Sequence, residues 1–363
     1  MLHWIGEGDL TVNGSGSHAI HNAGSLIRSG DGTTTVGIAF NNSGSLEVQQ
    51  GTLQVSVGGA STSGIVIGAG ALFDLAGGTL SMTNASNVSG QGLFRIAGGT
   101  LDLPVNESLS MNNLSFTSGQ ISGGGTLTLS GDSVWTSGAM TSPTGKLVIA
   151  SGGTLQITGT STKLLSRILE SAGTITYDGS GLFFGVSNNE PGTINNLSGG
   201  VLHWIGEGDL TVNGSGSHAI HNAGSLIRSG DGTTTVGVAL NSSGSVVVQQ
   251  GTLQIGGVFN SSGSLSIPQG STLNAAGGGT VSGTVTVSSG GVLRSSGGIL
   301  TLASSFQSDG DVQVAGGGIL IGEGVSVTMN NLSFTSGQIS GGGTLTLSGD
   351  SVWTSGAMTS PTG

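Results

Sequence analysis

The stretch "GSLEVQQGTLQV", residues 44–55, decides the fold. A glycine and a small residue precede an apolar–any–apolar step, a short polar turn follows, and the step then returns. Alternation over such short runs is typical of strands with one buried face. The frame recurs throughout the chain, for example as "GLFRIAGGTLDL" at 92–103, "GSVVVQQGTLQI" at 244–255 and "GDVQVAGGGILI" at 310–321.

The first glycine of each frame is an anchor that recurs from Gly24 to Gly363 at separations of 19 to 33 residues. Each run holds only two or three apolar residues, too few to close a core alone, whereas stacked rungs bury a continuous interior. Neighbouring rungs then bond as parallel strands. We therefore predict an all-β protein, a right-handed parallel β-helix (β-solenoid) of about 14–16 rungs, with residues 1–363 forming one continuous solenoid.

A longer repeat overlies the rungs. Residues 2–37 recur letter for letter at 202–237, an offset of 200, whereas residues 111–145 recur at 329–363, an offset of 218. The 18 extra residues amount to about one rung, which a solenoid accepts as one further layer. We expect a first module at 2–201 and a second, truncated module at 202–363 with one extra rung.

Composition excludes several classes of protein. Of 363 residues 73 are glycine, only 7% are charged, and 35% hydrophobic residues argue against disorder. A net charge of −11 with 7 basic residues makes nucleic acid or an anionic membrane an unsuitable partner. No run approaches the ~20 apolar residues of a membrane span, so we expect no membrane insertion. The absence of cysteine excludes thiolate metal sites.

The stretch "IHNAGSLIRSGDGTTTVGIAFNNSGSLEVQQGTLQV", residues 20–55, is similar to repeats of large bacterial surface proteins, and "ESAGTITYDGSGL" at 170–182 resembles them too. Those proteins resemble filamentous-haemagglutinin and autotransporter-passenger β-helices. The resemblance covers essentially the whole chain. It implies a right-handed parallel β-helix, secretion to the cell surface or exterior, and a structural or adhesive role, and it offers no catalytic residues to carry over.

Candidate catalytic groups are few. Glu7 and Asp9, repeated as Glu207 and Asp209, are expected to be solvated turn carboxylates, with a weak calcium contact as the alternative. A carbohydrate-cleaving β-helix would gather several carboxylates, and usually Lys or Arg, on one face. His18 lies three residues before His21, but a bend between them makes their directions diverge. We therefore predict no catalytic, cofactor-binding or metal site, and no enzyme.

Tryptophan offers the one ligand hypothesis from single residues, since exposed indoles stack on sugars. In "SVWTSG" the side chains of Val134 and Trp135 face opposite sides, which leaves one of them outside or at a corner. Packing or a corner role is the simpler interpretation, and ligand contact is the alternative. The candidates for such contact are Trp4, Trp135, Trp204 and Trp353.

The expected function is a non-enzymatic structural or adhesive segment of a large repetitive secreted or cell-surface protein: a stalk, an adhesin shaft or a fibre component. The alternatives are a carbohydrate-binding or carbohydrate-cleaving β-helix and an ice-binding solenoid, for which "TLTL" at 126–129 and "TVTV" at 284–287 supply threonine pairs. Expected partners are surface glycans and further copies of the module, either in a longer parent chain or tip to tip between chains. The tips would lie near Leu2 and Gly363, neither of which carries a cap, a charged run or a proline.

Overall fold

The computed structural model describes residues 1–12, 15–83, 87–186 and 190–360. These residues form 46 strands and no helix. No helix long and apolar enough to cross a membrane occurs in this described part of the chain. The strands pair in parallel and stack as a β-solenoid, so the predicted fold class is confirmed. Gly363, the last anchor and an expected tip, lies outside the described residues.

The chain divides into two compact units. Unit 1 comprises Met1–Ile175, Gly185–Thr193 and Asn213–Ser217, and unit 2 comprises Thr176–Phe184, Ile194–Val212 and His218–Gly363. Continuity of the whole chain in one solenoid, with modules at 2–201 and 202–363, stays a prediction.

The strands of unit 1 are β1 (Leu2–Trp4), β2 (Gly8–Leu10), β3 (Ala19–Asn22), β4 (Ser25–Arg28), β5 (Thr33–Val36), β6 (Ala39–Asn42), β7 (Ser45–Val48), β8 (Thr52–Val55), β9 (Gly58–Ser61), β10 (Ile65–Ile67), β11 (Leu72–Leu75), β12 (Thr79–Met82), β13 (Val88–Ser89), β14 (Leu93–Asp102), β15 (Ser108–Met111), β16 (Leu114–Ser122), β17 (Thr126–Leu129), β18 (Asp132–Trp135), β19 (Gly138–Met140), β20 (Lys146–Ile149), β21 (Thr154–Gly159), β22 (Lys163–Leu165) and β23 (Ile168–Ser171). Two strands, β24 (Thr174–Gly179) and β26 (Thr193–Asn196), span the division.

The strands of unit 2 are β25 (Leu182–Phe184), β27 (Val201–Trp204), β28 (Leu210–Val212), β29 (Ala219–Asn222), β30 (Ser225–Arg228), β31 (Thr233–Val236), β32 (Ala239–Ser242), β33 (Ser245–Val248), β34 (Gly251–Ile255), β35 (Phe259–Ser261), β36 (Ser264–Ile267), β37 (Ser271–Ala275), β38 (Gly279–Val281), β39 (Thr284–Val287), β40 (Val292–Ser295), β41 (Ile299–Leu302), β42 (Phe306–Ile321), β43 (Ser326–Gly341), β44 (Thr344–Leu347), β45 (Val352–Trp353) and β46 (Ala357–Thr359).

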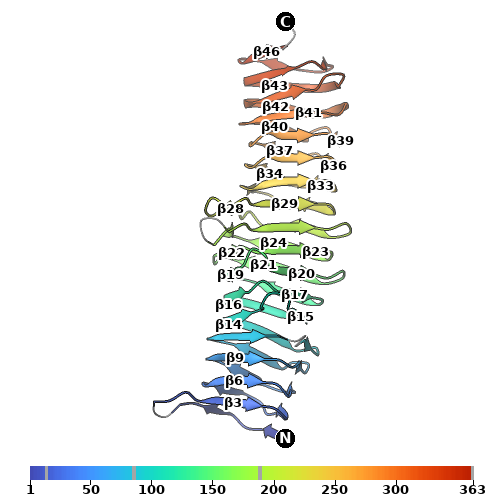
Figure 1. Cartoon of the computed structure of the whole chain (residues 1–363). Helices are drawn as coiled ribbons and strands as arrows, with labels where there is room; N and C mark the ends of the chain where they lie inside the picture. The colour runs from blue at the N-terminus through green and yellow to red at the C-terminus, as the bar shows by residue number, and fades with distance from the viewer. Residues whose placement is uncertain (13–14, 84–86, 187–189, 361–363) are drawn as a thin grey trace. The chain divides into compact units, whose positions relative to one another are not determined.

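Each coil consists of three strands, because a strand pairs with the strand three places further along. In unit 1, β3 pairs with β6 and β6 with β9; in unit 2, β34 pairs with β37 and β37 with β40 (Figure 1). The paired residues lie about 20 positions apart, as Leu53 and Phe73 do. One coil is therefore about 20 residues long.

The structure has about 18 coils, so the predicted 14–16 rungs were too few. The error lies in the anchors. Gly64 precedes β10, whereas Gly92 precedes β14, which pairs with β11 on the next face. Their 28-residue separation is thus one coil plus one strand. Most of the longer anchor separations mark a change of face in this way, although Gly173 and Gly200 precede the paired strands β24 and β27, and counting each long separation as a single rung loses coils.

The interior follows from the alternation. Leu53, Phe73 and Phe94 lie on successive coils, all with 0% of their surface exposed, and the two phenyl rings stack with centroids 4.9 Å apart. Burying such a side chain contributes roughly 1.5–3 kcal/mol. The apolar side chains of a single coil are too few to cover one another, so this burial depends on the coils above and below.

The anchor glycines are required by close approach between coils. A Cβ on Gly44 would overlap the carbonyl oxygen of Gly24 one coil below, and one on Gly244 would overlap that of Gly224. Neither Gly44 nor Gly244 has a positive φ, in contrast to Gly51 in the polar turn, whose φ is 67°. Glycine is therefore required at the anchor because there is no room for a side chain, and not because the backbone is left-handed.

Candidate functional site

A column of buried polar side chains follows one corner of unit 2. We call Asn196, Asn222, Ser242 and Ser261 the buried amide column; each is at most 4% exposed. Asn196 Nδ2 donates to Asn222 Oδ1 (2.7 Å), and Asn222 Nδ2 donates to Ser242 Oγ (2.9 Å) and to the carbonyl oxygen of Ser245 (2.9 Å). These bonds pair both side-chain amide nitrogens of the column and hold the bend that follows each strand, whereas Asn196 Oδ1 and Ser261 Oγ have no hydrogen-bond partner among the described residues.

The outer side of the same corner is a groove of about 540 Å³, which we call the asparagine groove. Its floor comes from the outward side chains of five strands, β26, β29, β32, β35 and β38: Asn195, His221, Asn241, Asn260 and Thr280. Its rim comes from the turns after these strands: Leu197, Ala223, Ser243, Ser262 and Ser282. Because coils lie ~4.8 Å apart, five of them extend over about 19 Å.

Hydrogen bonds orient the amides of the floor. Asn260 Nδ2 donates to Asn241 Oδ1 (2.9 Å), and Asn260 Oδ1 accepts from the backbone N–H of Thr280 (3.2 Å). Within the described parts of the chain, Asn241 Nδ2 has no hydrogen-bond partner. The floor thus presents a fixed series of amide and hydroxyl groups that can donate to and accept from a polar ligand.

The groove carries almost no charge. Among its lining residues His221 is the only titratable group, and there is no carboxylate, lysine or arginine. Acid–base catalysis on a glycosidic bond requires a pair of carboxyl groups flanking it. The groove therefore has the groups for binding, but not those for this chemistry.

Unit 1 repeats the buried column with one difference on the outside. Asn22 Nδ2 donates to Asn42 Oδ1 (2.7 Å), and Asn42 Nδ2 donates to Ser61 Oγ (3.1 Å). Asn41 accepts from the backbone N–H of Ala60 (3.2 Å), so the position of Asn260 carries a methyl group here. The two corners share a run of buried polar side chains, in which Ser242 of unit 2 takes the place of Asn42, and they differ in the second outward amide.

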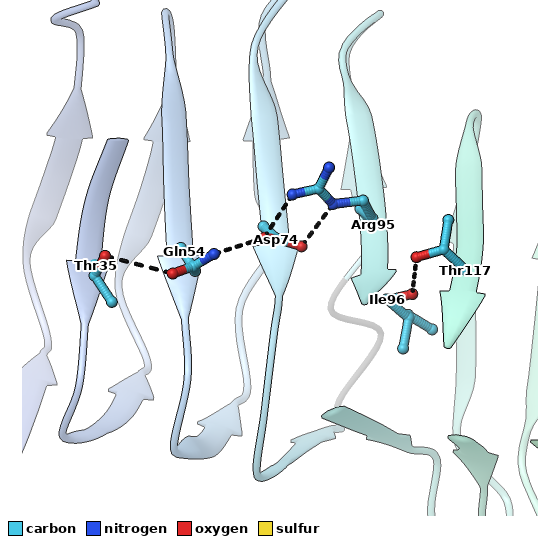
Figure 2. Close-up of polar contacts among 6 residues, drawn as sticks. All are labelled: Thr35, Gln54, Asp74, Arg95, Ile96 and Thr117. Atoms are coloured by element: carbon cyan, nitrogen blue, oxygen red, sulfur yellow. Dashed lines mark hydrogen bonds and ion pairs between the residues drawn. The ribbon is translucent and has the colours of Figure 1, made fainter. Parts of the chain in front are cut away.

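A second polar cluster follows one face of unit 1 (Figure 2). Thr35 on β5 donates to Gln54 on β8 (Oγ1 to Oε1, 3.4 Å), and Gln54 Nε2 donates to Asp74 Oδ2 on β11 (2.9 Å). Arg95 on β14 donates to both oxygens of Asp74, each at 2.8 Å. Burial opposes ionisation of Asp74, but the hydrogen bonds and charge of Arg95 outweigh it and lower the pKa of Asp74. Every group is paired, which indicates a structural role.

The four candidate tryptophans do not form one surface. Trp135 and Trp204 are 0% and 2% exposed, so no sugar can stack on either ring. Trp135 Nε1 donates to the Ser137 carbonyl (3.0 Å), and Ile157 of the next coil pairs with Trp135. Trp353 is 57% exposed and Trp4 partly exposed. A stacking role is therefore restricted to these two, at opposite ends of the described chain.

The acidic and histidine candidates are scattered. Glu7, Asp9, Glu207 and Asp209 are all exposed, and Asp209 Oδ1 accepts from the backbone N–H of Thr235 (2.8 Å). His218 is buried, with its ring centroid 6.3 Å from that of Phe184. No group of three metal-ligating side chains occurs among the described residues.

The threonine pairs do not stack into an array. Thr126 and Thr128 lie beside Lys146 and Val148 of the next coil. The same two columns therefore change residue type within one step, unlike the regular surface that ice binding requires.

The sequence prediction missed the asparagine groove. The phrases "HNAG", "NSSG" and "NSSG", beginning at His221, Asn241 and Asn260, supply three of the outward side chains of its floor. Their first residue points outward and their second points inward, as the exposure of Asn260 and the burial of Ser261 show. The signal was present as a polar residue at the same outward position in consecutive coils.

Fold and site together define a β-solenoid with a polar groove. The chain matches no protein-family model, and neither the curated proteins nor the solved structures compared with it show a significant similarity.

Proposed function

We propose that the chain is a non-enzymatic structural or adhesive segment of a large, repetitive bacterial protein that is secreted or displayed on the cell surface, where it acts as a stalk, adhesin shaft or fibre component. The observation that carries this proposal is the coil itself: each apolar layer is closed by its neighbours, so the protein lengthens by whole coils of about 20 residues. A stack of coils that lengthens in this way separates whatever lies before its first coil from whatever lies after its last.

A buried arginine supports a role in which the chain resists mechanical force. Arg167, which is 0% exposed, donates from Nη1 to the carbonyls of Gly123 (2.9 Å) and Thr141 (3.0 Å), and from Nη2 to that of Gly125 (2.6 Å). Burial lowers its pKa to about 10, partly offset by the charge of Asp102, so it remains charged at neutral pH. The guanidinium thereby joins its own coil to Gly125 and Gly123, which lie 42 and 44 residues earlier in the sequence.

Single-molecule pulling tests the shaft. We expect high resistance followed by stepwise extension, each step releasing one or more coils of ~20 residues, or ~70 Å of chain per coil. Arg167→Met should lower the force at which unit 1 yields, whereas Lys146→Met, which removes a side chain that is 43% exposed, should lower it less. Extension at low force without steps would contradict the proposal.

Carbohydrate cleavage is the enzymatic alternative. A degradation screen against plant, algal and bacterial polysaccharides tests it directly. We expect no release of reducing ends, and sustained turnover would overturn the non-enzymatic assignment.

A further inference from the structure

We propose that the asparagine groove binds an uncharged glycan chain that lies across the coils of unit 2, along the direction in which they stack. This inference does not depend on the shaft proposal, because a structural segment can carry the site or lack it.

The polar side chains on the floor of the groove repeat at the spacing of the coils. Asn241, Asn260 and Thr280 present one polar side chain on each of three successive coils, with ~4.8 Å between neighbours. A ligand made of similar units in a row can place a hydroxyl group near each of them. A glycan is such a ligand, and its length per sugar unit is comparable with the spacing between neighbouring coils.

The groups in the groove match a sugar chemically. Asn241 Nδ2 is a donor without a partner among the described residues, and Asn260 is held in place by Asn241 and the Thr280 N–H. Amides and hydroxyls both donate and accept, as sugar hydroxyls do. Leu197, 38% exposed, and Ala223 add apolar surface for the C–H faces of a ring.

Other polymers fit less well. The lining has no cation for a phosphate, sulfate or uronate group, and the net charge of −11 opposes anions at longer range. A peptide cannot add as a strand, because β32 already pairs with β29 and β35, and β35 with β38. An uncharged glycan remains.

Calorimetric titration of the full chain tests the proposal. The probes are hexasaccharides of glucose, mannose and N-acetylglucosamine, with a hexasaccharide of galacturonic acid as the anionic counterpart. We expect binding of at least one uncharged probe and none of the anionic one. Asn260→Ala and Thr280→Val should each weaken binding about tenfold, the effect of losing ~1.4 kcal/mol.

The chain supplies matched controls. Ala60 occupies the position of Asn260 in unit 1, so the fold accepts alanine there. Asn41→Ala, which removes the unit 1 equivalent of Asn241, should leave affinity unchanged. The proposal is overturned if no uncharged probe binds at millimolar concentration, if the galacturonate probe binds more tightly, or if binding survives Asn260→Ala and Thr280→Val together.

Discussion

Tyr177 reports on the interior of unit 2, since it is the only tyrosine in the chain. Its hydroxyl donates to the Asp209 carbonyl (3.2 Å), and burial, together with the charge of Asp209, raises its pKa to about 12. An unfolded tyrosine ionises near ~10. The stabilisation from the neutral phenol is thus complete below pH ~10 and is lost as the pH rises toward about 12.

We therefore expect the phenolate absorbance to titrate about two units higher in the native chain than in denaturant. Absorbance titration in both states measures this difference. A native midpoint near ~10 would contradict burial of the hydroxyl.

Asp74 makes the opposite prediction, at acid pH. Because its folded pKa lies below the unfolded one, the carboxylate stabilises unit 1 above pH ~4 and ceases to do so as the pH falls through the folded value. Asp74→Asn should lower the free energy of unfolding by ~1–2 kcal/mol at neutral pH, a figure reduced because Arg95 reaches solvent.

The difference between Asp74→Asn and wild type should shrink as the pH falls below ~4 and the carboxyl group becomes protonated in both states. Urea unfolding at several pH values measures it, and exposed Asp132→Asn serves as the control. Asn274 occupies the corresponding place in unit 2, where it bonds Gln254 (3.0 Å), so the fold accepts an amide. A difference independent of pH would show that the ion pair is not the cause.

At the scale of the element, the buried amide column determines how stable a corner is. Asn222→Ala would remove the donor that Asn222 Nδ2 supplies to Ser242 Oγ and to the carbonyl oxygen of Ser245, and unsatisfied buried groups cost ~1–3 kcal/mol. We expect ~2–3 kcal/mol less stability by urea unfolding. The control Asn241→Ala, on the outer side of the next coil, should cost below ~0.5 kcal/mol. Equal losses would assign no special role to the column.

Whether the sequence predicts that a residue is buried depends on what causes its burial. Leu53 and Phe73 were placed correctly because the period of two puts one face inside. Asn222 and Arg228 were not, because the same period also places polar residues inside, where bonds to the neighbouring coil, such as those of Arg228 Nη1 to the carbonyls of Trp204 and Ile205, make burial tolerable. Those partners lie about 20 residues away, beyond any local pattern. The asparagine groove escaped prediction for the same reason.

At the scale of the molecule, whole coils should be removable. Deleting residues 245–263 joins Gly244 to Ser264, which preserves the phrase "NSSGS" and moves β36 into the place of β33. We expect a folded unit 2 with the circular dichroism of β-structure and a cooperative melt. Deleting residues 245–254 instead removes half a coil and should abolish the cooperative transition. Equal tolerance of both deletions would contradict coil-by-coil packing.

The three-strand spacing also determines how such a chain acquires its structure. Every strand finds its partner about 20 residues away, so closing each new loop has the same small entropic cost however long the chain is. A first stack of coils is then a nucleus, and each further coil adds to it as a molecule adds to the face of a growing crystal. The slow step is formation of that nucleus, and the time to complete the rest grows only in proportion to the number of coils.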